Sequence, residues 1–236
     1  MKLFAEQASC LGLAFHVLAY YEEDTGRTAA IRVEDSGDCR IVVIDEAGCA
    51  TESLEAAKRA LPLLLGGSLR SFTLDCSEGN MGGDILSYRG IVSRLLESAR
   101  YGLVDCLRRL AVQPPEYFYI AGWNGLYALG PGDEYRVSLP QVPGVVFAHT
   151  HPGGLCYPSG KDLRSTADFL SSGGLAEIIV SPRCTYAIYL EAPMAEDDYW
   201  ALQEAARCVN NAKDGEEYIS CLQRLAGLRT VAASLL

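Results

Sequence analysis

The chain has 236 residues, a formal net charge of −10 and 49% hydrophobic residues, which allows one large domain or two small ones with buried cores. The negative charge disfavours binding to nucleic acid, because the phosphate backbone attracts clustered Lys and Arg. The sequence has no apolar run of about 18 residues, and its first residues do not resemble a signal peptide. We therefore expect a cytoplasmic protein that binds neither nucleic acid nor a membrane.

Nine cysteines are many for a cytoplasmic chain of this length, and none of them stands in a Cys-x-x-Cys pair. A structural zinc ribbon is therefore not expected. The odd number leaves at least one thiol free or paired with another chain. We expect most of the cysteines to be buried apolar thiols, with room for one or two disulfides.

The first third of the chain is expected to form a small α+β domain over residues 1–82. Turn signals rich in Gly and Asp separate short apolar runs, and Thr51 is a candidate helix N-cap. The expected strands are residues 11–21, 28–34, 40–45 and 69–76, and the expected helix runs from Thr51 to the Gly66-Gly67 pair. The glycine-rich residues 77–83 mark the expected domain boundary.

The remainder, residues 83–236, is expected to form an α/β domain. Apolar residues recur at helical spacing over residues 84–111, and Pro114-Pro115 ends that helix. The expected strands are residues 117–121, 125–129, 135–139, 145–148, 177–180 and 185–190, and the other expected helices are residues 162–170 and a pair over residues 196–228 joined near Asp214-Gly215. These elements predict a mixed sheet flanked by helices, with the helix before Pro114 on one face and the helix after Asp162 on the other.

Two of the three histidines, His149 and His151, follow the apolar run at residues 145–148, which is expected to be a buried strand. Alternate residues of a strand point to the same face, so both imidazoles can reach one metal ion. Asp162 follows after a short loop and offers a carboxylate oxygen. Two His and one carboxylate with an open fourth position form a catalytic zinc set, so we predict one Zn²⁺ bound by these three side chains and water.

Two further residues of metal-binding type are expected to take no part in the metal site. The third histidine, His16, lies in an expected strand far away in sequence, and a structural role is predicted for it. Cys156 lies in the loop between the predicted ligands. We expect an inert thiol there, with a metal-binding thiolate as the alternative.

The segment from His149 to Asp162 has the pattern His-x-His-Pro, six residues, Ser, two residues, Asp, and it resembles the motif of the JAMM/MPN zinc metalloproteases. His149, His151, Pro152, Ser159 and Asp162 occupy all five positions of the motif. The resemblance covers residues 85–192. It implies the JAMM/MPN fold, which is cytidine-deaminase-like, for this part of the chain.

The resemblance also implies two catalytic residues. The family uses an upstream glutamate near the start of a strand that borders the metal, and Glu116, just before the expected strand at 117–121, is our candidate for this general base. Glu97 and Glu134 are its rivals. Ser159 is expected to donate a hydrogen bond to the oxyanion of the tetrahedral intermediate, and it could also cap the helix that follows.

The function that the resemblance implies is a zinc-dependent peptidase or isopeptidase. Its substrate would be a ubiquitin-like or sulfur-carrier protein, cut after the C-terminal glycine of an extended tail that can add as a strand to a sheet edge. One alternative is a non-catalytic MPN-type interaction subunit, and such subunits usually lack a metal ligand. The other is a RadC-like DNA-associated protein, whose related stretch has Ser-Gly where this chain has Gly153-Gly154. The N-terminal domain could recognise substrate, mediate homo-oligomerisation or only stabilise the enzyme.

Overall fold

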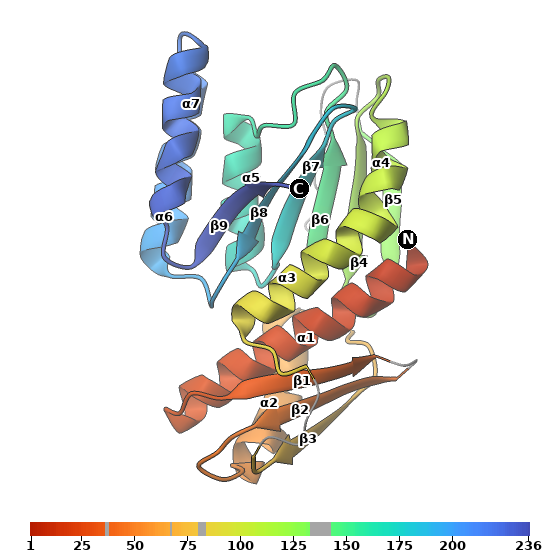
Figure 1. The fold of residues 1–236 in the computed structure, drawn as a ribbon, viewed down its shortest axis with the longest axis vertical. Coiled ribbons are helices and arrows are strands. Elements are labelled where there is room, and N and C mark those ends of the chain that lie inside the picture. The colour runs from red at the N-terminus through yellow and green to blue at the C-terminus, as the bar shows by residue number, and fades with distance from the viewer. Residues whose placement is uncertain (36–37, 67, 80–83, 133–142) are drawn as a thin grey trace.

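The computed structural model describes residues 1–35, 38–66, 68–79, 84–132 and 143–236, and in them the strands form two sheets (Figure 1). The smaller sheet has the order β1-β2-β3, with β1 (Ala30–Asp35), β2 (Cys39–Ile44) and β3 (Phe72–Ser77). β1 and β2 are antiparallel, and β2 and β3 are parallel. The parallel connection runs through helix α2 (Thr51–Leu64), as such pairs require a crossover.

The larger sheet has the order β5-β4-β6-β7-β8-β9. Its strands are β4 (Tyr117–Gly122), β5 (Tyr127–Pro131), β6 (Gly144–Thr150), β7 (Ala176–Val180), β8 (Thr185–Leu190) and β9 (Val231–Leu235). Only β6 and β7 pair in parallel among these neighbours, so the sheet is mixed as predicted. The coarse expectation of an α/β fold with a mixed sheet flanked by helices is therefore confirmed.

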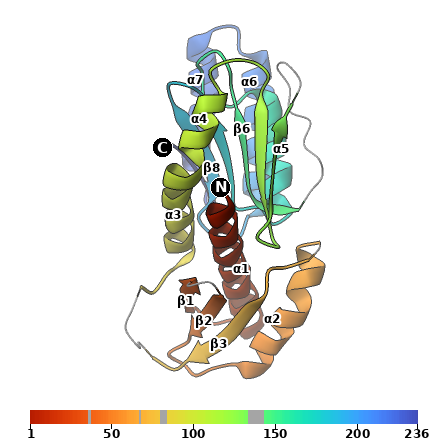
Figure 2. The same ribbon diagram turned by 90° about the vertical axis from the view of Figure 1, so that its right-hand side faces the viewer.

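Helices cover both faces of the larger sheet (Figure 2). One face carries α3 (Tyr88–Ala99), a π-helical turn (Arg100–Val104) and α4 (Asp105–Leu110), and the other carries α5 (Gly160–Ser171). Outside α5 lies α6 (Glu196–Asn211), followed by α7 (Gly215–Gln223) and a 3₁₀ turn (Arg224–Gly227). The predicted placement of the helices on opposite faces agrees with this arrangement.

Helix α1 (Lys2–Thr25) shows that the expected strand at residues 11–21 was wrong. These residues are apolar almost throughout, and such a run does not distinguish a buried strand from a buried helix by periodicity. We call the three-stranded sheet with α2 the smaller unit, and the six-stranded sheet with α3 to α7 the larger unit. α1 packs against β1, β2 and α2 of the smaller unit and also against α3, β4 and β6 of the larger one. A helix covered on several sides is apolar all round, which removed the amphipathic signal.

The same helix is, within the described ranges, the one that is long and apolar enough to cross a bilayer by length and composition. In this fold 67% of its most apolar 18-residue window is buried inside the protein. A core helix and a membrane span share this composition, and in the described fold α1 contacts both sheets.

Several element boundaries differ from the expectation. The helix expected from residue 84 begins at Tyr88, where the side chain of Ser87 caps it by accepting a hydrogen bond from Gly90 N, and the π-helical turn interrupts it. Strand β9 was missed because its short sequence after Thr230 has little periodicity. The strand expected at residues 135–139 lies outside the described residues. The domain boundary expected at residues 77–83 stays a prediction. α1 contacts both sheets, so the two parts of the chain are not separate in their packing.

Four disulfide bonds form among the cysteines, which is more than the one or two expected. They are Cys10–Cys39, Cys49–Cys76, Cys156–Cys184 and Cys208–Cys221. Cys106 remains a free thiol, in agreement with the odd number. The expectation of mostly free, buried thiols was wrong, because the pairs join residues 13 to 29 positions apart that only the fold brings together.

Candidate metal centre

The two motif histidines stand at the end of β6, a strand that is buried along its whole length between β4 and β7. His149 is 3% exposed, and His151, just beyond the strand, is partly exposed. The Nε2 atoms of the two rings are 3.1 Å apart. The alternation of side chains along an extended chain therefore places both imidazoles on one side of the sheet, as predicted.

Asp162 reaches the same place from the first turn of α5. A capping box sets its conformation: the Ser159 backbone N–H donates to Asp162 Oδ2 over 2.7 Å, and the Asp162 N–H donates to Ser159 Oγ over 3.1 Å. Asp162 Oδ1 lies 3.5 Å from His149 Nε2, and Oδ2 lies 3.4 Å from His151 Nε2. One ligand atom from each of the three side chains lies within 4.8 Å of the others, so the group could bind a metal ion.

The far nitrogen of each ring has its own partner. His151 Nδ1 donates to the carbonyl oxygen of Leu155 over 3.2 Å. His149 Nδ1 faces Glu177 Oε1 at 3.3 Å, although without the geometry of a good hydrogen bond. With the proton on Nδ1 in both rings, each Nε2 carries its lone pair toward the space between the rings and Asp162. This tautomer is the one in which both rings could bind a cation together with Asp162.

Glu177 was not singled out from the sequence. It lies on β7, is fully buried, and its Oε2 accepts a hydrogen bond from the hydroxyl of Thr166 on α5. The available signal was a single carboxylate in the otherwise apolar segment Ala176–Val180, because a buried carboxylate needs a partner. Nothing in the sequence identified that partner as His149.

The charges of this cluster shift one another's protonation. Burial raises the pKa of Glu177, and the neighbouring His149 offsets only part of that rise. Burial opposes a charge on His149, but interaction with Glu177 and the charge of Asp162 raise the pKa of the imidazole overall. Burial alone would raise the pKa of Asp162, yet the hydrogen bond with His151 and the charges of both rings bring it below its usual range. Asp162 is therefore a carboxylate, the form that binds a cation.

Glu116 lies directly before β4, beside this cluster. β4 pairs with β6 so that Phe118 faces His149, and the antiparallel register continued by two residues places Glu116 opposite His151. Burial raises the pKa of the Glu116 carboxyl, while the charges of His149 and His151 lower it in part. A raised pKa suits a group that accepts a proton and later donates it.

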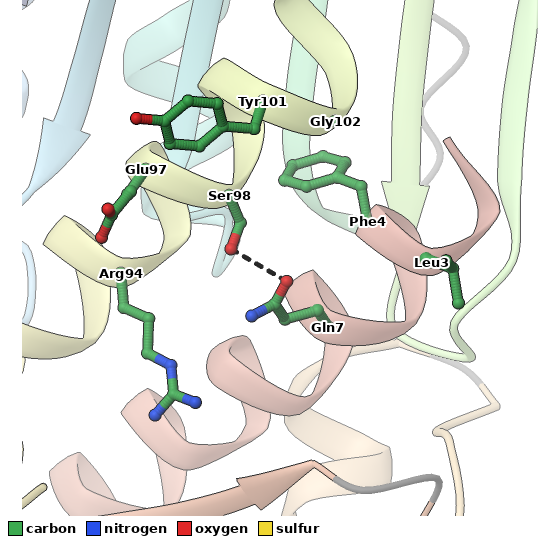
Figure 3. Close-up of a pocket in the computed structure, with 8 residues that line it drawn as sticks. All are labelled: Leu3, Phe4, Gln7, Arg94, Glu97, Ser98, Tyr101 and Gly102. Atoms are coloured by element: carbon green, nitrogen blue, oxygen red, sulfur yellow. Dashed lines mark hydrogen bonds between the residues drawn. The ribbon is translucent and has the colours of Figure 1, made fainter.

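Of the two rival glutamates, the structure describes only Glu97, which lies elsewhere. Glu97 lines a groove between α1 and α3, together with Gln7, Arg94 and Tyr101 (Figure 3). Glu134 lies outside the described residues. Among the three candidates, Glu116 is thus the one for which the structure gives an interaction with the histidines and Asp162.

The loop between the ligands is tied to the end of the sheet. Cys156 is fully buried and forms a disulfide with Cys184, which lies between β7 and β8. The sulfur is therefore neither the free thiol that was expected nor available as a thiolate ligand. Leu155, whose carbonyl orients His151, directly precedes this anchor and is itself 73% exposed.

The third histidine has a structural contact, as predicted, although it lies in α1 and not in a strand. His16 Nε2 donates to the carbonyl oxygen of Gly173 over 2.8 Å, at the end of α5. Burial lowers the pKa of His16, so the ring is neutral at pH 7. It links α1 to the larger unit and takes no part in the metal centre.

Comparisons of the chain with protein-family models, with curated proteins and with solved structures found no match. The residues and geometry of the site are therefore the basis for inferring its function.

Proposed function

We propose that this chain is a zinc-dependent peptidase or isopeptidase of the JAMM/MPN type, acting after the C-terminal glycine of a ubiquitin-like or sulfur-carrier protein. The observation that carries the proposal is the convergence of His149 Nε2, His151 Nε2 and the Asp162 carboxylate on one point, with Glu116 beside them. This donor set, at the spacing of the JAMM/MPN motif, favours hydrolysis over a purely structural role. An interaction subunit would not need a positioned carboxylate next to an open coordination site.

The donor atoms suit zinc in type and in spacing. Two neutral imidazoles and one carboxylate are typical of catalytic zinc, whereas Mg²⁺ and Ca²⁺ prefer sites made of oxygen alone. Each Nε2 lies 3.5 or 3.4 Å from one oxygen of Asp162, Oδ1 for His149 and Oδ2 for His151, and the 3.1 Å separation of the two Nε2 atoms comes close to the edge of a tetrahedron. That edge is about 3.3 Å for metal–ligand bonds of about 2.0–2.1 Å. The side chains of His151 and Asp162 are 19% and 17% exposed, so a substrate can approach from their side.

When bound, zinc supplies Lewis-acid polarisation of a carbonyl and a lowered pKa for water. Glu116 accepts the proton of the attacking water and passes it to the leaving amine, for which its raised pKa is suitable. Ser159 Oγ uses a lone pair to cap α5 and can donate its O–H to the oxyanion of the tetrahedral intermediate. The side chains of β6 and α5 hold these groups in place on a rigid frame.

The sheet offers a route for an extended tail. β5 is an edge strand among the described strands, its side chains are mostly exposed, and its end lies beside Glu116, whose carbonyl accepts a hydrogen bond from Gly132 N over 2.7 Å. A glycine-rich tail that adds as a strand along β5 would be led toward the metal centre. This supports a substrate whose scissile bond follows an extended C-terminal segment.

The test is a cleavage assay on a ubiquitin-like protein fused through its terminal glycine to a reporter, with metal content measured on the same samples. The wild-type chain should contain zinc and cleave the fusion. Glu116→Gln keeps the size of the side chain but not its basicity, so zinc should stay bound while turnover falls about 10²-fold or more. Glu97→Gln is the matched control and should leave turnover unchanged. Zinc binding without cleavage would favour the interaction-subunit alternative, and full activity of Glu116→Gln would show that another group is the base.

A further inference from the structure

The buried carboxylate of Glu177 has no role in the function proposed above. It is fully buried, and its only ion-pair contact in the described part of the chain is His149. Glu177 Oε1 and His149 Nδ1 both lack a hydrogen-bond partner of good geometry among the described residues. A buried carboxylate in this state costs stability unless a nearby positive charge compensates it. Because this carboxylate costs stability, we expect it to serve a function other than stabilising the fold.

We propose that Glu177 is a positioning residue for the metal centre, which it serves by holding His149 in one tautomer and one ring orientation. The inference rests on the proposed metal site but not on the proposed peptidase activity. The contact at Nδ1 keeps the proton there, so that Nε2 presents its lone pair toward His151 and Asp162. A carboxylate behind a metal-ligating imidazole also raises the basicity of the ligand.

The two histidines differ in the group that faces Nδ1 of the ring. His151 has a neutral partner, the carbonyl oxygen of Leu155, on a loop. His149 has a charged partner on the rigid strand β7. Contacts to a charged acceptor are stronger than contacts to a neutral one.

Thr166 extends the arrangement to the third ligand. It lies four residues after Asp162 on α5, hence on the same side of the helix. Its hydroxyl contacts Glu177 Oε2 and also lies 2.8 Å from the carbonyl oxygen of Asp162. One buried hydroxyl thus connects the helical turn that carries Asp162 with the carboxylate behind His149. The Thr166 hydroxyl thus links α5, which carries Asp162, to β7, whose Glu177 contacts His149 on β6.

The experiment measures Co²⁺ affinity and the Co²⁺ d–d absorption spectrum, which reports ligand geometry without any need for activity. Glu177→Ala should bind Co²⁺ about 100-fold more weakly than wild type, and Glu177→Gln about 10-fold more weakly, because the amide oxygen still accepts from Nδ1. Thr166→Val should also weaken binding, by less than Glu177→Ala. Both Glu177 variants should change the intensities of the d–d bands.

The matched control is Asp198→Asn, since Asp198 is also a buried carboxylate, 3% exposed, but it accepts hydrogen bonds from the Arg229 and Thr230 backbone. It should lose stability yet keep wild-type Co²⁺ affinity and spectrum. Wild-type affinity and spectrum in Glu177→Gln and Glu177→Ala would overturn the inference and leave the metal site intact. If Glu177→Ala does not fold, Glu177→Gln decides alone. A wild-type chain that binds neither Co²⁺ nor Zn²⁺ would overturn the metal site and this inference with it.

Discussion

The two halves of the molecule each bury a polar cluster, and the two clusters differ in how complete they are. In the smaller unit Asp45 is 1% exposed. It accepts hydrogen bonds from the Tyr21 hydroxyl at 2.7 Å, from Ala47 N at 2.8 Å and from Arg27 Nη1 at 3.3 Å. Tyr21 in turn accepts from Ala50 N at 3.0 Å. Every member has a partner within the chain, so this cluster stabilises the fold by itself.

The cluster of the larger unit is left incomplete by the chain. His149 and Glu177 are as deeply buried as Asp45, yet their facing atoms have no hydrogen-bond partner of good geometry among the described residues. The two imidazole Nε2 atoms face each other at 3.1 Å with a carboxylate beside them. A cation bound at the two Nε2 atoms would place a positive charge near the buried His149–Glu177 pair, which the described residues leave without a hydrogen bond of good geometry. The Asp45 cluster is therefore structural, whereas the cluster around His149 is the candidate for a functional one.

The largest effect should come from removing a ligand of the incomplete cluster. His149→Ala and Asp162→Ala should each abolish stoichiometric zinc, because two ligands do not hold the ion tightly. Asp45→Asn removes a charge from the complete cluster and should leave the zinc content at one per chain. Metal analysis of the purified variants measures both effects. Full zinc occupancy in His149→Ala and in Asp162→Ala would disprove the assignment of the site.

Two disulfides with loops of nearly equal length allow the next comparison. Cys10–Cys39 and Cys156–Cys184 close loops of 29 and 28 residues. Replacing either pair by serines should therefore lower the free energy of unfolding by a similar amount, about 3–4 kcal/mol by loop-closure entropy. Only the loss of Cys156–Cys184 should also weaken metal binding, because it releases the loop whose Leu155 carbonyl orients His151. Denaturant titrations and metal affinities test this pair, and equal metal affinity in both variants would contradict it.

Removing either of two helix caps should have a smaller effect on stability, and only one of the two changes should also reduce activity. Ser159 caps α5 through Asp162 N, and Asp214 caps α7 through Glu217 N. Alanine at either position should cost about 1 kcal/mol of unfolding free energy. Ser159→Ala should in addition reduce turnover about 10²-fold or more, as loss of an oxyanion donor does. If Asp214→Ala reduces turnover as much, the effect of Ser159 is that of a cap alone.

The smallest expected effect is on the pH dependence of stability, and it comes from Asp45 in the complete cluster. The Tyr21 hydroxyl, with further donors, holds the pKa of Asp45 below its usual range against the opposing effect of burial. A carboxyl whose pKa is lower in the folded than in the unfolded state stabilises the fold above the unfolded pKa, near 4, and this contribution is lost as pH falls through the folded value. The stability difference between wild type and Asp45→Asn should therefore be largest near neutral pH and shrink below about pH 4. Chemical denaturation of the metal-free proteins at several pH values measures it, and a constant difference would rule out the linkage.

Much of the larger unit could be predicted because its signals are local. The buried strand at residues 145–148 and the helix that begins near Asp162 follow from apolar runs and capping residues, and both agree with the structure. The prediction of a strand at residues 11–21 was wrong because its signal is not local. α1 is covered by both units, and its apolar sequence reflects tertiary burial more than its own periodicity.

The sequence by itself determined the three candidate ligands and the cap that holds one of them. His149 and His151 share a side because a strand alternates, and Ser159 and Asp162 meet because a first helical turn spans three residues. The tertiary structure alone decided the pairing of the cysteines, the position of α1 between two sheets and the contact of Glu177 with His149. Glu177 comes from β7, 28 positions after His149, and only the parallel pairing of β6 with β7 under α5 brings a carboxylate behind that ring. Contacts of this kind depend on which elements become neighbours, and no spacing along the chain encodes them.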